Sequence, residues 1–275
     1  MIIVLNSKQR VIITGSSGFI GSSLYSYLKN KNMDCLGISR SKSIYTDIVI
    51  DNYEEVISMN DGNSLLINLA GNNINVSEEE TKFVNSLSES FKNKMIFISS
   101  AQVYGSSSEG PIAEHQQISK KKDYAKSKLA LENKVLEHKG MVLRLSNIYG
   151  KGMSKKNIFH TIYSQVKDNG KEIALKNTMA IRDFIYIDDL CECILKIISD
   201  GVQNIILNIG TGKGTDILTL VKHICDNLNH TFDGLNIISE NNFHDNIVVD
   251  PYLLKKKYNW KSKITIEEGI KKWLI

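Results

Sequence analysis

The first half of the chain alternates short apolar runs with segments of helical periodicity. Runs rich in β-branched residues predict strands at 11–13, 35–38, 47–50, 65–69, 95–99 and 141–145. Helical patterns lie between them, at 19–28, 54–59, 78–91 and 124–137. Strands that are apolar along nearly their whole length are typical of a parallel sheet covered on both faces. The pattern therefore predicts an α/β fold with a doubly wound parallel sheet, in which ligands bind beyond the carboxyl ends of the strands.

After residue 150 the pattern loosens. Helices are expected at 157–166, 188–198, 215–228 and 266–273, and strands at 181–187 and 205–209. No internal repeat or low-complexity linker divides the chain. We predict two parts: a sheet domain over residues 1–150 and, over 151–275, a smaller C-terminal lobe interleaved with the last strands of the sheet.

Composition and charge are those of an ordinary globular protein. Of the 275 residues, 42% are hydrophobic and 23% charged, and the formal net charge of +4 is scattered along the chain. The lysine run 120–122 is the exception, and so short a run is usually a solvated loop. We expect no nucleic-acid partner. We also expect no membrane association, because no stretch approaches the roughly 20 apolar residues that span a bilayer.

The four cysteines, Cys35, Cys191, Cys193 and Cys225, show no CxxC spacing. Buried free thiols in a reducing compartment account for them better than disulfides or a metal site. The apolar start of the chain is interrupted at residues 6–10, before the core of a signal peptide could form. These features predict a cytoplasmic protein without a metal centre.

Residues 14–21 read TGSSGFIG and lie between the first strand and the first helix. Three glycines at this spacing permit a tight turn, close approach to a pyrophosphate, and close packing of helix on strand. The N–H groups at the start of the helix also favour phosphate. An ordinary turn can carry such glycines, but their position after the first strand favours dinucleotide binding. The predicted cofactor contacts in this crevice are Gly15, Ser17, Gly18, Phe19, Ile20, Gly21, Leu69, Ala70 and Gly71.

The end of the second strand bears on the choice of cofactor. An acidic residue there would bind the ribose 2′-hydroxyl of NAD, but this chain has Ser39 and Arg40. Arg40 is one of only four arginines, and its guanidinium can hold a 2′-phosphate; a surface arginine is the alternative. The sequence therefore favours NADP(H) and leaves NAD(H) open. Asp51, at the end of the next strand, is a candidate contact for adenine.

Tyr124 and Lys128 lie four residues apart in a helical pattern, so their side chains share one face. A nearby ammonium lowers the pKa of a tyrosine from its usual value of about 10. The pair alone is weak, because Tyr-x-x-x-Lys occurs by chance on many helices. Ser100 strengthens it, since this serine lies at the end of a strand that opens onto the same crevice. Its hydroxyl can align the reacting oxygen with Tyr124.

A series of motifs over nearly the whole chain resembles the extended short-chain dehydrogenase/reductase family, which includes the nucleotide-sugar epimerases, dehydratases and reductases. In order, they are TGSSGFIG, NLAG (68–71), ISSAQVYG (98–105), YAKSK (124–128), LRLSNIYG (143–150), RDFIYIDDL (182–190) and LNIGTGKG (207–214). The resemblance implies a Rossmann-type fold with dinucleotide binding over 1–150 and mostly substrate binding over 151–275. It also implies a nucleotide-diphosphate sugar as substrate, and we expect a homodimer.

The resemblance assigns roles to individual residues. It makes Ser100 the catalytic hydroxyl, Tyr124 the acid/base, and Lys128 the residue that holds the nicotinamide ribose. Asn147 and Asn157 are grouped with Ser100 as substrate contacts. Arg182 resembles the arginine on the diphosphate, although an ion pair with one of the aspartates at 188–189 is the alternative.

Three departures from the family pattern bear on the reaction. The stretch after Gly71 is short, and residues 240–245 contain no arginine where relatives carry a second diphosphate contact. Ala101 and Gln102 replace the Asp-Glu pair that a 4,6-dehydratase uses for elimination. The third departure argues against dehydration.

We therefore favour NADPH-dependent reduction of a nucleotide-4-keto-sugar, with Tyr124 as the acid. An NAD-dependent 4-epimerase is the alternative, because it uses the same catalytic residues. A non-catalytic dinucleotide sensor is a third reading, which the intact set of Ser100, Tyr124 and Lys128 disfavours.

Overall fold

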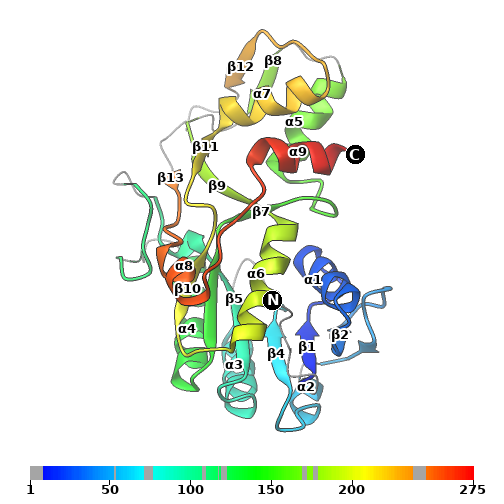
Figure 1. The fold of residues 1–275 in the computed structure, drawn as a ribbon, viewed down its shortest axis with the longest axis vertical. Coiled ribbons are helices and arrows are strands. Elements are labelled where there is room, and N and C mark those ends of the chain that lie inside the picture. Colours follow the sequence, from blue (N-terminus) through cyan, green and yellow to red (C-terminus); the bar gives the residue numbers. More distant parts are fainter. Residues whose placement is uncertain are drawn as a thin grey trace.

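The computed structural model describes residues 9–52, 54–70, 77–106, 110–116, 118, 123–168, 172–175, 179–237 and 246–275. Within these residues the largest element is a seven-stranded sheet whose neighbouring strands are all parallel (Figure 1). Its strands are, in spatial order, β3 (Ile48–Val49), β2 (Cys35–Ser39), β1 (Val11–Thr14), β4 (Leu65–Asn68), β5 (Met95–Ser100), β6 (Met141–Leu145) and β10 (Ile206–Ile209). This is the strand order of a Rossmann-type sheet, so the predicted fold class is confirmed.

Helices cover both faces of this sheet. On one face, Val11 and Ile13 of β1 join a core with α1 (Phe19–Asn30) and α6 (Ile187–Asp200). On the other face, Ile12 joins a core with α2 (Glu55–Ser58), α3 (Glu78–Ser90) and α4 (Asp123–Glu137). Because successive side chains of a strand point to opposite faces, burial on both faces makes every position apolar.

The chain reverses its direction of travel across the sheet between β1 and β4. It leaves β1 toward β2 and β3 on one side, and it returns to build β4, β5 and β6 on the other side. Two neighbouring strands whose connections diverge leave a crevice at their carboxyl ends. Gly15 follows β1, and Leu69 and Ala70 follow β4, so these predicted contacts flank the crevice.

The second half of the chain builds a smaller set of strands above this edge (Figure 1). A second sheet contains β7 (Asn147–Tyr149), β9 (Ile181–Tyr186), β11 (Gly214–Asp216) and β13 (Asn246–Ile247), and β8 (Glu172–Leu175) pairs with β12 (Gly234–Ile237). Helices α5 (Ile158–Lys167), α7 (Ile217–Asn227) and α9 (Ile266–Leu274) pack in series beside these strands. Strand β10 and helix α6 return to the large sheet, and α8 (Tyr252–Tyr258) packs against β10.

Several short elements differ from the sequence-based expectation. A helix was expected from residue 215, but 214–216 form β11, and α7 begins only after Asp216, whose carboxylate accepts a hydrogen bond from Thr219 N at 2.8 Å. Strands β7, β8, β12 and β13 and helix α8 were not predicted. Strands of two to four residues are too short to show an alternating pattern.

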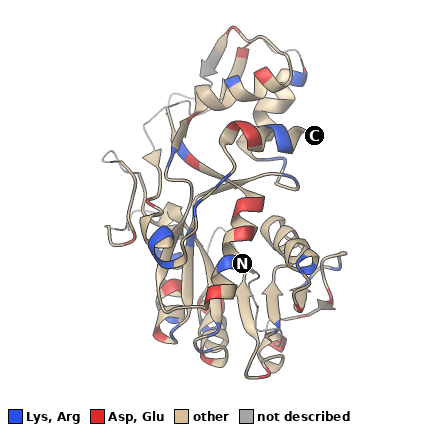
Figure 2. Cartoon of the chain, viewed as in Figure 1, with Lys and Arg blue, Asp and Glu red and all other residues tan. Residues whose placement is uncertain are grey.

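Acidic and basic residues are interspersed over the helices and loops of the described chain (Figure 2). Helix α9 illustrates the pattern: Glu267 and Glu268 lie in its first turn and Lys271 and Lys272 in its last, which complements the helix dipole. Among the described residues, no helix combines the length and apolarity needed to cross a bilayer. All four cysteines are buried and unpaired. The lysine run 120–122, the stretch 71–76 and the segment 240–245 lie outside the described residues.

Candidate active site

The glycine turn brings backbone atoms unusually close together. Gly15 has a φ of +70°, and a Cβ atom there would lie 3.1 Å from backbone atoms of Leu69 and Ala70. At Gly21, a Cβ would lie only 2.2 Å from the carbonyl oxygen of Gly15. The first turn of α1 can therefore pack directly on the loop that precedes it only because position 21 has no side chain.

This turn forms one wall of a cavity of about 380 Å³ beyond the carboxyl edge of the sheet. Residues predicted from four separate parts of the sequence meet in its lining. They are Gly15, Gly18, Phe19, Ile20, Gly21, Leu69, Ala70, Ser100 and Lys128. The glycine cradle and the start of α1, with its free N–H groups, fit the pyrophosphate of a dinucleotide.

Lys128 lies inside this cavity wall and is 6% exposed. Its Nζ lies 5.5 Å from the centre of the Phe97 ring. Burial lowers the pKa of Lys128, and the carboxylates of Glu80 and Glu132 oppose that shift. Tyr124 lies one turn earlier in α4, while its side chain is outside the described part of the structure.

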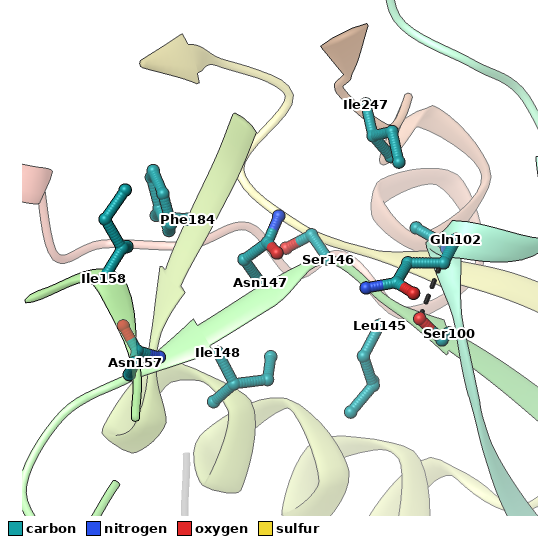
Figure 3. A pocket seen from close by; sticks show the side chains of 11 residues that line it. Ser100, Gln102, Leu145, Ser146, Asn147, Ile148, Asn157, Ile158, Phe184 and Ile247 are labelled. Carbon is teal, nitrogen blue, oxygen red and sulfur yellow. Dashed lines mark hydrogen bonds between the residues drawn. The ribbon is translucent and has the colours of Figure 1, made fainter. Parts of the chain in front are cut away.

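Ser100 ends β5 at the point where the chain turns into the short 3₁₀ helix η1 (Ala101–Val103). Its hydroxyl accepts a hydrogen bond from Gln102 N at 3.2 Å, which orients the side chain. Ser100 also lines a second cavity of about 350 Å³ (Figure 3). Ser100 therefore lies where a ligand in the first cavity and a ligand in the second cavity would meet.

Polar and apolar side chains together line the second cavity, which Figure 3 shows from close by. Its polar side chains include Gln102, Asn147 and Asn157. Asn147 Nδ2 donates to the carbonyl oxygen of Asp183 at 3.2 Å. The amide oxygen of Asn157 accepts from Phe159 N at 3.0 Å and caps α5, so this predicted substrate contact also has a structural role.

A third cavity, of about 550 Å³, adjoins the second and shares Asn147 with it. Its lining contains Arg182 and Lys156, which is a suitable environment for a diphosphate. The alternative role for Arg182 was an ion pair with Asp188 or Asp189. Asp189 accepts from the N–H groups at 263 and 264, each at 2.9 Å, and Asp188 lies 3.5 Å from Nζ of Lys272. Both aspartates thus have other partners.

The residues proposed for cofactor choice lie near the turn but outside the described cavity lining. The hydroxyls of Ser17 and Ser39 are 2.6 Å apart, which joins the end of β2 to the glycine turn. Arg40 follows at the exposed end of that strand. Asp51 is exposed, and its N–H donates to Glu55 Oε1 at 2.9 Å. Gly71 lies outside the described residues.

A buried polar network supports the floor of the site. Arg144 is 1% exposed, and its Nη2 pairs with Glu132 Oε2 at 2.6 Å. The Ser99 hydroxyl donates to the same carboxylate, and Arg144 Nη1 donates to the Tyr104 hydroxyl at 2.9 Å. Tyr104 in turn donates to Asn208 Oδ1 at 2.8 Å. The network joins α4 to β5, β6 and β10; its member Ser99 lies next to Ser100 in the chain, and its member Glu132 lies one helical turn from Lys128.

Two residues near the site were not singled out from the sequence. Lys156 lines the third cavity beside Arg182, and Ser146 lines both the first and the second cavity. Ser146 directly follows β6, so the signal that identified Ser100, a hydroxyl at the carboxyl end of an apolar strand, applied to it as well. Lys156 stands among other exposed lysines and gave no such signal.

Solved structures with similar folds carry nicotinamide cofactors. A dTDP-glucose 4,6-dehydratase from Bacillus anthracis in complex with NAD superimposes with a TM-score of 0.82 at 20% identity, covering 97% of this chain and 95% of the other. RMD from Pseudomonas aeruginosa, complexed with NADPH, superimposes with a TM-score of 0.78 at 20% identity, covering 97% of this chain and 98% of the other. These likenesses concern the fold.

Curated relatives include different reaction types. A putative UDP-glucose 4-epimerase of Methanocaldococcus jannaschii is 25% identical over 95% of this chain and 96% of its own length. A dTDP-4-dehydro-6-deoxyglucose reductase of Escherichia coli is 22% identical over 96% of each chain. The profile of the NAD dependent epimerase/dehydratase family matches residues 11–210, a span from the first strand of the large sheet to the end of its last. On that match, this chain is an enzyme that belongs to the NAD dependent epimerase/dehydratase family, within the extended short-chain dehydrogenases/reductases.

Proposed function

We propose that this enzyme reduces a nucleotide-4-keto-6-deoxysugar with NADPH. The observation that carries the proposal is the position of Ser100 in the wall common to two cavities, one with the glycine turn and Lys128, the other with asparagine and glutamine side chains. A cofactor in the first cavity and a sugar in the second would meet at this wall. The third cavity, with Arg182 and Lys156, would hold the diphosphate. In this arrangement residues 1–150 hold the cofactor and part of the sugar, and residues 151–275 hold the diphosphate and the rest of the sugar.

Each residue of the set has a defined task in this reaction. The nicotinamide cofactor, when bound, supplies the hydride. Ser100 donates a hydrogen bond to the carbonyl oxygen and fixes it near Tyr124, which gives that oxygen a proton. The ammonium of Lys128 stabilises the phenolate that Tyr124 becomes. Because burial lowers the pKa of Lys128, its proton is also less tightly held than that of an exposed lysine.

Two features favour reduction over the other reactions of the family. Ser39 and Arg40 stand where an acidic residue would select NAD, and Ser39 lies within hydrogen-bond distance of the turn at Ser17. Ala101 and Gln102 lack the carboxylates that elimination of water needs, and Gln102 lines the proposed sugar cavity instead. The reductase of Escherichia coli is similar over nearly the whole chain.

A nucleotide-sugar 4-epimerase is the second candidate, supported by the similarity to the putative UDP-glucose 4-epimerase. An epimerase must retain its cofactor, because its keto intermediate is reduced again in the same site. A reductase must exchange its cofactor in every cycle.

Extraction of the purified protein and chromatography of the released nucleotide test this difference. We expect little tightly bound NAD, and stoichiometric consumption of NADPH when a nucleotide-4-keto-6-deoxysugar is added. Near-stoichiometric NAD in the extract, with interconversion of two UDP-sugars and no net use of NADPH, would establish the epimerase instead.

A further inference from the structure

The wall between the first two cavities contains a second hydroxyl besides that of Ser100. Both cavities share the same four lining residues, which are Ser100, Leu145, Ser146 and Ile148. The hydroxyl of Ser100 accepts a hydrogen bond from Gln102 N. The hydroxyl of Ser146 has no hydrogen-bond partner among the described residues, although its oxygen exposes less than 1 Å².

The backbone at Ser146 is held firmly in place. Its N–H donates to the carbonyl oxygen of Ile209 in the neighbouring strand β10 at 2.9 Å, and it connects β6 directly to β7. The side chain therefore has one main freedom, rotation about χ1 among its staggered positions. Because Ser146 lines both cavities, such a rotation gives the hydroxyl a way to reach a bound ligand.

A buried hydroxyl without a partner is unfavourable, and most buried polar groups in native proteins are paired. A serine in this place is accounted for if a ligand supplies the missing partner. The two cavities differ in what they offer. The first is lined by the glycine turn, Lys128 and apolar side chains such as Ile20, Leu69 and Ile98, which suit a dinucleotide. The second presents the amides of Gln102 and Asn147, which suit a hydroxylated ligand.

We propose that Ser146 is a substrate-binding residue whose hydroxyl donates a hydrogen bond to the sugar of the nucleotide sugar, beside the carbon that exchanges hydride. Ser100 and Ser146 then both contact the reacting sugar from the wall that the two cavities share. The inference rests on the proposed function, since it needs a sugar in the second cavity. It adds a contact that selects among sugars by the position of their oxygen atoms.

Ser146→Ala tests the contact, with binding measured by calorimetry for UDP-, GDP- and dTDP-sugars and for the matching free nucleoside diphosphates. We expect the preferred nucleotide sugar to bind about tenfold more weakly, which corresponds to about 1.4 kcal/mol. The affinities for the free diphosphate and for NADPH should not change, because neither carries the sugar. The melting temperature should stay the same or rise, since no protein hydrogen bond is lost.

Ser146→Cys separates hydrogen bonding from side-chain volume. A thiol fills the space of the hydroxyl but is a weak donor, so the cysteine variant should lose as much sugar affinity as the alanine variant. Ser88→Ala is the matched control: it removes a buried hydroxyl, bonded to Val84 O, that lines none of these cavities, and it should leave sugar binding unchanged.

Three results would overturn the proposal. Unchanged sugar affinity in Ser146→Ala would show that the hydroxyl does not contact the sugar. Full sugar affinity in Ser146→Cys would show that the side chain only fills space and that its hydrogen bond does not contribute. If Ser146→Ala weakens the binding of the nucleotide sugar and of the free nucleoside diphosphate equally, Ser146 does not contact the sugar. If the parent binds no nucleotide sugar at all, the proposed function fails together with this inference.

Discussion

The proposed cofactor side and the proposed substrate side of this site are built in different ways. On the cofactor side, the shape comes from backbone atoms in close approach, with no room for a Cβ at Gly21. On the substrate side, it comes from side chains on short elements of the second sheet, such as Asn147 on β7 and Arg182 on β9. A backbone cradle tolerates almost no substitution, whereas side chains on a fixed frame can be exchanged one at a time. One family can therefore keep its cofactor chemistry while its sugars change.

Loss of the proposed proton donor should have the largest effect. Tyr124→Phe removes only the phenolic hydroxyl that carries the transferable proton, so turnover should fall by about a hundredfold or more while the affinity for NADPH stays nearly the same. Steady-state kinetics and cofactor titration measure the two quantities. Turnover within a few-fold of the parent would remove Tyr124 from the mechanism.

Gly21→Ala tests whether the cofactor side depends on backbone approach. The added methyl group would lie 2.2 Å from the carbonyl oxygen of Gly15, so the turn must shift. We expect a loss of about 1–3 kcal/mol in the free energy of unfolding, as for other overpacked sites, and at least tenfold weaker cofactor binding. Gly234→Ala is the control, because a Cβ there meets no atom within 4 Å. Equal behaviour of the two variants would show that the turn adapts.

Arg40→Ala asks whether a side chain, and not the cradle, chooses between the two nicotinamide cofactors. A charge-assisted hydrogen bond to phosphate contributes about 1.5–3 kcal/mol, so the preference for NADP over NAD should fall by about tenfold or more. Arg10→Ala is a suitable control. Arg10 forms an ion pair with Asp34 and directly precedes β1, so it lies at the amino end of the strand, away from the carboxyl edge that holds the proposed site. If Arg40→Ala lowers the affinities for NADP and NAD equally, Arg40 does not contact the 2′-phosphate.

The smallest expected effect is the contribution of Lys128 to the pH dependence of the free energy of unfolding. Burial lowers its pKa in the folded state below the ordinary value of 10.5, so the unfolded chain binds more protons between those two values. The free energy of unfolding of the parent should therefore rise with pH in this window, relative to Lys128→Met. Urea unfolding of both proteins at several pH values measures the difference. A difference that stays constant or falls as the pH increases would contradict the lowered pKa.

The sequence predicts the large sheet better than the second sheet, for a physical reason. Strands β1, β4 and β6 of the large sheet are buried along their whole length, so their continuous apolar runs are visible locally, and the glycines after β1 stand where the backbone demands them. The second sheet consists of short strands, and its pairing depends on distant partners, as when β7 joins β9. Asn157 stays a predicted substrate contact, and the structure adds that its side chain caps α5. Ser146 follows an apolar strand, as the sequence shows, but that its hydroxyl lacks a hydrogen-bond partner among the described residues is visible only in the structure.

The network beneath the site has a consequence for attempts to exchange parts between relatives. Asn208 accepts from Tyr104 and donates to the Ile112 carbonyl at 2.8 Å, while its own N–H donates to Glu114 Oε1 at 2.8 Å. All three partners belong to the first half of the chain, and Asn208 belongs to the second. A chimera cut after residue 150 would inherit Asn208 from one parent and its partners from another. Grafts that change the sugar specificity should therefore carry 206–209 together with the first half, and take only the strands and helices above the sheet from the donor.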